Sequence, residues 1–149
     1  MKKLLPQANN LAMVIDVFIY YSYKKDCSIQ DIASFCGFER RQAQYYFNAC
    51  IYLGLVGEDN LLSDFGKELY VLNKDLIKRK IYEHILRDDL FGEVFAHLVL
   101  FPEDNIRDYC SRMLSTFYPK YGKSVLYRRA GTIISWCKET RDFVFKVNA

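Results

Sequence analysis

Four polar side chains in the first half of the chain have the types and the spacing that suit contact with a nucleic acid. Their spacing of three and four residues would place them on one face of a helix: Arg41, Gln44, Tyr45 and Asn48. The planar groups of Arg, Gln and Asn match the edges of guanine and adenine, and a Tyr hydroxyl can reach phosphate or sugar. The pattern therefore predicts a helix that reads double-stranded DNA, with Arg40 beside this face.

The residues on either side of this stretch predict a helix-turn-helix. Ser28 is a favourable N-cap for a short first helix, and Gly37 supplies the left-handed residue that ends it. The second helix then begins near Glu39, and of its adjacent tyrosines Tyr46 is assigned to the core. Helical spacing places the other apolar residues of this second helix together, at Ala43, Phe47, Cys50 and Ile51.

A small hairpin and a further helix are predicted to follow. Two short apolar runs flank the turn-forming tetrapeptide Gly57–Asn60, which predicts a hairpin in the position of a wing. Ser63 then caps a helix that ends near Val71. An amphipathic helix from about Asn10 to Tyr23 precedes the pair and would support it. Together these elements predict a mainly α protein with a winged helix-turn-helix.

The second half of the chain also has a helical pattern. Apolar periodicity predicts helices after Asn73, around residues 91–99 and from Ile106, and a last helix from an N-cap at Ser124 to about Thr140. Its inward side would carry Leu126, Ala130, Ile133 and Cys137. We therefore expect a winged-helix domain over residues 1–72 and a helical subdomain over 73–149.

Basic residues at the start of the last helix suggest a second site of contact. Arg128 and Arg129 stand roughly where an arginine pair stands in the first reading helix, so this half is either a second helix-turn-helix or a plain helical extension. With Lys123, they are predicted DNA contacts. One of the two arginines is expected to pair with Asp104 or Asp108 while the other stays free.

The charge of the chain is uneven. The net charge of +3 combines +5 from Pro119 onward with −2 before it. The basic residues of this last part are Lys120, Lys123, Arg128, Arg129, Lys138, Arg141 and Lys146. Such a region favours a polyanionic partner. The acidic Glu58 and Asp59 of the predicted wing argue against close contact between the wing and phosphate.

Composition indicates an ordered globular protein without a membrane span. The 149 residues are 51% hydrophobic and 16% aromatic. No apolar run approaches the roughly 20 residues that a membrane helix needs, and Pro6 interrupts the N-terminal segment, so we expect a cytoplasmic protein. The odd number of cysteines and their wide spacing predict reduced core thiols and no metal site. No cofactor is predicted.

Two histidines and one tryptophan receive structural interpretations. Glu93 and His97 are spaced as a helical metal pair but lack further ligands, so a hydrated surface is favoured. His84 likewise has no diagnostic partner. Trp136 is expected in the core, as a lone Trp usually is.

Three segments resemble winged-helix DNA-binding modules found in bacterial regulators and with type II restriction endonucleases. They are Glu39–Tyr46, Leu53–Val56 and Leu62-Ser63-x-x-Gly66-Lys67. The stretch Tyr127–Trp136 is similar to the Arg-Arg-Ala-x-Thr and Ser-Trp pattern that closes such restriction-associated modules. The resemblance implies DNA recognition, with reading-helix roles only for the four residues named first.

Catalysis is not expected. Nucleases of the common restriction type hold Mg²⁺ with an Asp and a Glu-x-Lys or Asp-x-Lys set, and neither tripeptide occurs in this chain. The chain would then be a recognition module or the companion of a nuclease. The alternative is a protein-interaction or dimerisation module, for which exposed Tyr45, Tyr52 and Phe143 would provide a surface.

Overall fold

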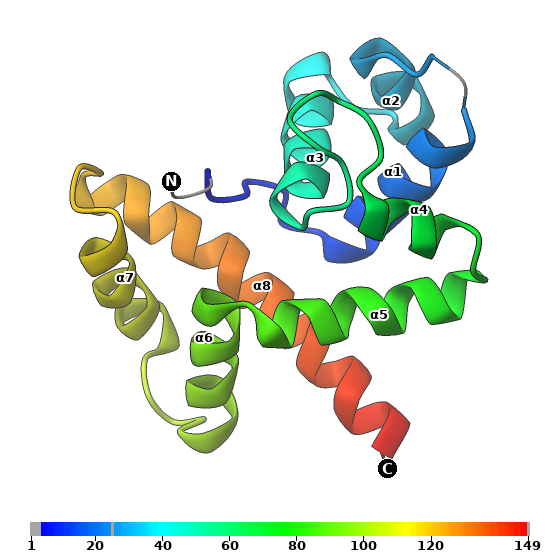
Figure 1. The fold of residues 1–149 in the computed structure, drawn as a ribbon. Coiled ribbons are helices and arrows are strands. Elements are labelled where there is room, and N and C mark those ends of the chain that lie inside the picture. The colour runs from blue at the N-terminus through cyan, green and yellow to red at the C-terminus, as the bar shows by residue number, and fades with distance from the viewer. Residues whose placement is uncertain (1–3, 25, 149) are drawn as a thin grey trace. The chain divides into compact units, whose positions relative to one another are not determined.

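The computed structural model describes residues 4–24 and 26–148, and these residues form a mainly α protein (Figure 1). The helices are α1 Leu11–Tyr23, α2 Ile29–Cys36, α3 Arg40–Tyr52, α4 Asp64–Tyr70, α5 Lys74–Arg87, α6 Asp89–Leu100, α7 Ile106–Phe117 and α8 Lys123–Asn148. The chain divides into two compact units, an N-terminal unit of residues 1–82 and a C-terminal unit of residues 83–149. This division falls inside α5, whereas the sequence suggested a boundary after residue 72.

Local hydrogen bonds set the ends of the first two helices, and the predicted N-cap at Ser28 is confirmed. The side chain of Asn10 accepts a hydrogen bond from Met13 N at 3.1 Å and caps α1. Ser28 and Asp31 form a reciprocal capping box at the start of α2. Gly37 ends α2 with a left-handed φ of 71°, which confirms its predicted role. An N-cap of this kind stabilises a helix by about 1 kcal/mol, so these short helices begin at defined residues.

Helix α3 turns its apolar side toward the core and packs on α1 and α2. Ala43, Tyr46, Phe47 and Cys50 are buried, as predicted, whereas Ile51 is half-buried. The prediction that Tyr52 is exposed is wrong, since only 7% of its surface is accessible. Tyr52 is buried because residues that follow α3 in the chain cover it.

The segment after α3 folds back over the last turn of that helix. Val56 N donates to Cys50 O, and Ser63 N donates to Leu55 O at 3.0 Å, so residues on both sides of the turn return beside α3. Tyr52 lines the same hollow as Val56 and Ser63. Periodicity within α3 could not show that later residues would enclose Tyr52.

The predicted hairpin is reduced to a turn closed by one antiparallel bridge, between Val56 and Leu62. Gly57 N donates to Leu61 O at 2.8 Å, and the phenol of Tyr21 in α1 donates to the carbonyl of Asn60. Within residues 4–24 and 26–148 this bridge is the sole β pairing. The turn is therefore held against α1 by a side chain rather than by strands.

Ser63 and Gly66 explain why α4 can begin close beneath this turn. Ser63 Oγ accepts a hydrogen bond from Gly66 N at 2.9 Å, which confirms the predicted cap, and its hydroxyl donates toward the carbonyl oxygens of Gly54 and Leu55. A Cβ atom on Gly66 would lie 2.2 Å from Leu55 O. Only glycine therefore fits at this position without a backbone shift.

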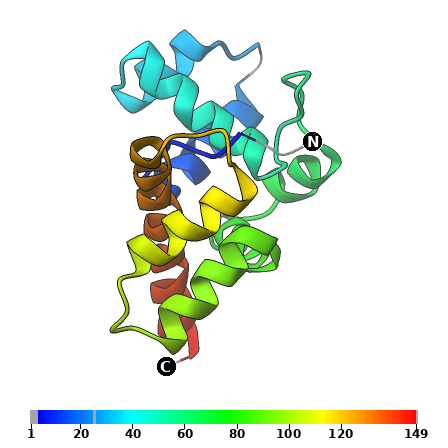
Figure 2. The same ribbon diagram turned by 90° about the vertical axis from the view of Figure 1, so that its left-hand side faces the viewer.

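In the C-terminal unit, α8 packs against both α6 and α7, and α7 lies beside the N-terminal half of α8 (Figure 1, Figure 2). Trp136 is fully buried and stacks on Phe91 of α6 with ring centroids 5.2 Å apart, which confirms its predicted place in the core. Residues 126, 130, 133 and 137 are also buried, as predicted.

Helix α8 is longer and more widely buried than predicted. It begins at Lys123, and Leu126 N donates to Gly122 O, so Ser124 is the second helical residue and not the N-cap. It continues past Thr140 because the following residues include no glycine or proline to end it. Burial extends beyond the predicted stripe to Thr132, Ile134 and Thr140. None of the helices in the described part of the chain combines the length and apolar composition needed to cross a membrane.

Candidate nucleic-acid interface

The four polar residues predicted on the exposed side of α3 meet there in two pairs. Arg41 Nε donates to Tyr45 Oη at 2.8 Å, and the guanidinium carbon lies 5.7 Å from the centre of the Tyr45 ring. Gln44 Nε2 donates to Asn48 Oδ1, also at 2.8 Å. Arg41, Gln44 and Asn48 are exposed and Tyr45 is half-buried. The structure therefore brings these side chains together on one face, with exposed Arg40 to one side.

These two pairs leave recognition groups available on α3. Arg41 uses Nε for Tyr45, so both terminal nitrogens retain their donors. Gln44 retains its carbonyl oxygen and Asn48 its amide nitrogen. Exposed pairs four residues apart on a helix contribute only about 0.2–0.5 kcal/mol each. The side chains can therefore exchange their partners for base edges at little cost.

Buried contacts hold α3 firmly on α1 and on the residues before it. Asn10 N donates to Tyr46 Oη at 3.2 Å, and the Phe47 ring lies 4.9 Å from that of Tyr21. The Cys50 thiol lies 3.7 Å from Val14 O. The polar face is thus presented by a helix whose opposite side is anchored at several points.

In the C-terminal unit, Lys123 and Arg128 are exposed and Arg129 is half-buried. The expected pairing of one arginine with Asp104 or Asp108 is wrong: within the described residues neither arginine forms an ion pair, and Asp104 instead lies 3.0 Å from His97 Nε2. Asp104 lies in the short loop between α6 and α7, four residues after the end of α6, so the histidine in the last turn of that helix is within its reach.

Aromatic and carboxylate neighbours, and not a set of metal ligands, surround His97. Its ring stacks on Tyr109 with centroids 3.7 Å apart, and Phe101 lies 4.9 Å away. Its polar partner is Asp104 and not Glu93, the residue that helical spacing suggested. Across residues 4–24 and 26–148, no group of three or more His, Cys, Asp or Glu side chains is placed to hold a metal ion.

Arg107 of α7 is a basic residue that the sequence analysis did not single out. Its Nε donates to Tyr127 O of α8 at 3.1 Å, and its guanidinium carbon lies 4.0 Å from the centre of the Tyr127 ring. Tyr127 also lines a hollow of about 350 Å³ that Arg112 and Lys123 border, together with Asp108. Basic side chains therefore gather where α7 meets the first turns of α8.

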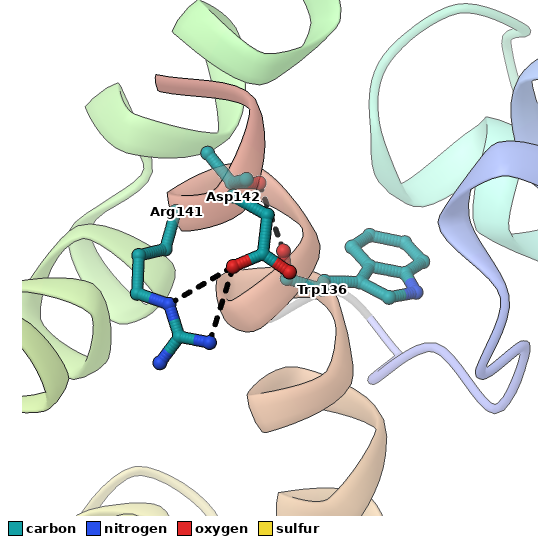
Figure 3. A network of polar contacts seen from close by, with 4 residues as sticks. Trp136, Arg141 and Asp142 are labelled. Atoms are coloured by element: carbon teal, nitrogen blue, oxygen red, sulfur yellow. Dashed lines mark hydrogen bonds and ion pairs between the residues drawn. The ribbon is translucent and has the colours of Figure 1, made fainter. Parts of the chain in front are cut away.

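The basic charge at the end of α8 is partly compensated. Arg141 Nε and Nη2 each lie 3.2 Å from Asp142 Oδ1, as Figure 3 shows. Neighbouring residues on a helix project in different directions, so this ion pair requires the long Arg141 side chain to bend toward Asp142. The net charge of +5 from Pro119 onward already includes Asp142, so this pair removes Arg141 from the positive charges that are open to a ligand and leaves the net charge as counted.

The cysteines do not form a nucleophilic site. All five thiols are free, as predicted, and Cys50, Cys110 and Cys137 are buried. Burial raises the pKa of Cys50 and of Cys110 to about 12, and it also raises the pKa of Cys137. Burial also raises the pKa of the partly exposed Cys27 and Cys36. The thiols are therefore protonated near neutral pH and are poor nucleophiles.

Comparison with known proteins places the chain in a family. It belongs to the family described as a domain of unknown function, DUF7226, which matches residues 13–140. No curated protein and no solved structure matches the chain. The matched span begins within α1 and ends within α8, so the family includes elements of both units.

Proposed function

We propose that this protein binds double-stranded DNA and that α3 enters the major groove to read base edges. The observation that carries the proposal is the exposed face of α3, where an arginine, two amides and a tyrosine lie together and hold one another only weakly. With 13 residues, α3 is about 20 Å long, and the major groove of B-DNA admits a helix. Its position after a capped helix and a left-handed glycine fits a helix-turn-helix.

A winged helix is part of the same proposal. The turn Gly57–Asn60 follows α3 where a wing would stand, and its bridge joins the residues on either side. Glu58 and Asp59 are exposed on this turn. Because two carboxylates would be repelled by phosphate, the turn in this proposal lies beside the DNA and contributes little to binding.

The proposed role is recognition without catalysis. A module of this kind would serve a restriction-modification system, together with a nuclease, or a transcription regulator. The lack of a Glu-x-Lys or Asp-x-Lys tripeptide supports this, since that set would be needed to hold Mg²⁺ and activate water in the common nuclease type. We further propose that the protein acts in the cytoplasm.

A protein-interaction surface is the second candidate, and one feature of the N-terminal unit favours it. Tyr20 and Phe35 stack with centroids 4.1 Å apart, although 49% of Phe35 is exposed. Together with Tyr23, which is 65% exposed, they line a hollow of about 460 Å³ on α1 and α2. Exposed aromatic side chains are enriched where proteins meet, so a second copy or a nuclease could bind there.

The test begins with selection of a preferred sequence from a pool of random duplexes, followed by binding measurements on that sequence and on an unrelated one. Arg41→Ala and Gln44→Ala should each cost about 1–3 kcal/mol on the preferred duplex and leave unrelated duplexes almost unaffected. Gln42→Ala is the matched control, because Gln42 is exposed on α3 but points away from the paired face.

Two results would count against the proposal. If the folded protein binds no duplex at low salt, DNA binding is wrong. If Arg41→Ala, Gln44→Ala and Gln42→Ala all leave the sequence preference intact, α3 does not read bases, and the protein-interaction function becomes the better interpretation.

A further inference from the structure

The guanidinium of Arg107 is held in one place by contacts on α8. Its Nε donates to the backbone oxygen of Tyr127 at 3.1 Å, and the guanidinium lies over the Tyr127 ring at 4.0 Å. Neither contact uses the two terminal nitrogens. An arginine anchored through Nε and its flat face therefore presents its remaining donors with little freedom left to lose on binding.

Gly131 of α8 provides the space in which this guanidinium lies. A Cβ atom at position 131 would lie 3.1 Å from Arg107 Nη2 and 3.4 Å from Arg107 Cζ. Glycine inside a helix is less favourable than alanine by about a factor of five in the equilibrium constant for helix formation. A glycine in the middle of this 26-residue helix thus has an evident use, which is the close approach of Arg107.

A second arginine lies on the same side of α8. Arg128 precedes Gly131 by three residues, so the two positions are neighbours on the helix surface. Arg128 is exposed and forms no ion pair within the described residues. Within the described residues neither Asp104 nor Asp108 forms an ion pair with Arg107 or Arg128, and Asp104 contacts His97 instead.

We propose that Arg107 and Arg128 together bind a phosphate group of the nucleic-acid backbone over Gly131. The planar donors of arginine match phosphate oxygens and form charge-assisted hydrogen bonds with them. Lys123 and Arg112 add positive charge in the hollow that Tyr127 also lines, and Asp108 offsets only part of it. This inference rests on the proposed DNA binding and adds to it a contact that holds the backbone independently of sequence.

The test measures binding of a random-sequence duplex of about 20 base pairs at several salt concentrations, where each lost phosphate contact lowers the salt slope by about 0.9. Arg107→Gln and Arg128→Gln should each weaken binding about tenfold for every sequence and reduce the slope by about one unit. Lys80→Gln is the matched control. Lys80 is exposed on α5 and belongs neither to the basic C-terminal region nor to the polar face of α3, so its loss should change neither quantity.

Gly131→Ala separates a binding role from a purely structural one. Alanine favours the helix and should leave the melting temperature unchanged or higher, while it displaces the guanidinium by a few tenths of an ångström and weakens duplex binding. If Arg107→Gln instead lowers the melting temperature and leaves affinity and salt slope unchanged, Arg107 only joins α7 to α8, and the inference is wrong.

Two further comparisons identify the source of the phosphate and separate this inference from the proposed function. If Arg107→Gln and Arg128→Gln abolish binding of inorganic phosphate, measured by calorimetry at constant ionic strength, but leave duplex affinity and salt slope unchanged, the site takes free phosphate and the backbone contact is wrong. If the Arg41 and Gln44 variants lose sequence preference but the Arg107 and Arg128 variants bind normally, only this inference fails. The reverse result would reject base reading by α3 and retain this site, and absence of any duplex binding would reject both.

Discussion

Asp31 shows how one side chain defines the start of the helix that precedes α3. Its carboxylate accepts hydrogen bonds from Ser28 N at 2.9 Å and from Ser28 Oγ at 3.0 Å. Both hydrogen bonds favour the charged carboxylate and lower the pKa of Asp31 below its usual value. The bond from Ser28 N has the larger effect and the bond from Ser28 Oγ the smaller one. Because the folded state prefers the carboxylate, Asp31 stabilises the protein above the unfolded pKa of about 4, and this contribution disappears as pH falls through the lower folded pKa.

The change Asp31→Asn should therefore destabilise the protein at pH 6 and have a smaller effect as the pH falls toward 3. Asparagine retains an acceptor for the Ser28 bonds but has no charge to lose. Urea unfolding of both proteins across this pH range measures the difference. Glu68→Gln, at an exposed position of α4, is the control. A difference between wild type and Asp31→Asn that stays constant with pH would contradict the assignment.

At the scale of elements, the positions of α3 and α4 depend on the segment between them, which packs closely against both helices. Ser63 links the start of α4 to Leu55 O, and Gly66 lets that carbonyl come nearer than any side chain would permit. The same segment encloses Tyr52 at the end of α3. The paired face on α3 is therefore supported by residues that follow it in the chain.

We expect Gly66→Ala to destabilise the protein by about 1–3 kcal/mol, since a Cβ atom 2.2 Å from a backbone oxygen forces the backbone to move. The midpoint of urea unfolding measures this loss. Lys67→Ala, on the exposed side of the same helix, should change stability by less than about 0.5 kcal/mol. Equal stability of the two variants would show that α4 can move away from Leu55 freely.

At the scale of the whole molecule, each unit contributes a different kind of basic or polar surface. The N-terminal unit carries the paired face of α3, and the C-terminal unit carries Arg107, which lies against α8, and Arg128 of α8 itself. The match to one family covers elements of both units. The proposals assign base reading to the first surface and backbone contact to the second.

We expect the purified protein to leave plasmid DNA uncut in the presence of Mg²⁺. The chain has no Glu-x-Lys or Asp-x-Lys tripeptide, and its described acidic, histidine and cysteine side chains form no group suited to a metal. Gel analysis of supercoiled plasmid after incubation with Mg²⁺ checks this. Cleavage activity that co-purifies with the protein and is lost in the Arg41→Ala variant would overturn the non-catalytic role.

Features that depend on neighbouring residues could be predicted from the sequence alone. The caps at Ser28 and Ser63 and the left-handed Gly37 were predicted correctly because their hydrogen bonds and backbone angles involve residues within a few positions. The buried side of α3 and the shared face of its polar residues follow from the helical period of 3.6. The mainly α fold follows from the same local regularities.

Only the tertiary structure decided which of the aromatic side chains expected at the surface are buried. It also decided which basic residues are fixed by contacts with other helices. Tyr52 is buried because a later segment returns over it, and Asp104 binds His97 rather than an arginine because of how the chain leaves α6. Arg107 meets Tyr127 twenty positions later and lies over Gly131. A mid-helix glycine was the one signal in the sequence for that contact. The physical reason is that caps and periodicity act over a single turn of helix, whereas these contacts depend on the path of the chain between distant residues.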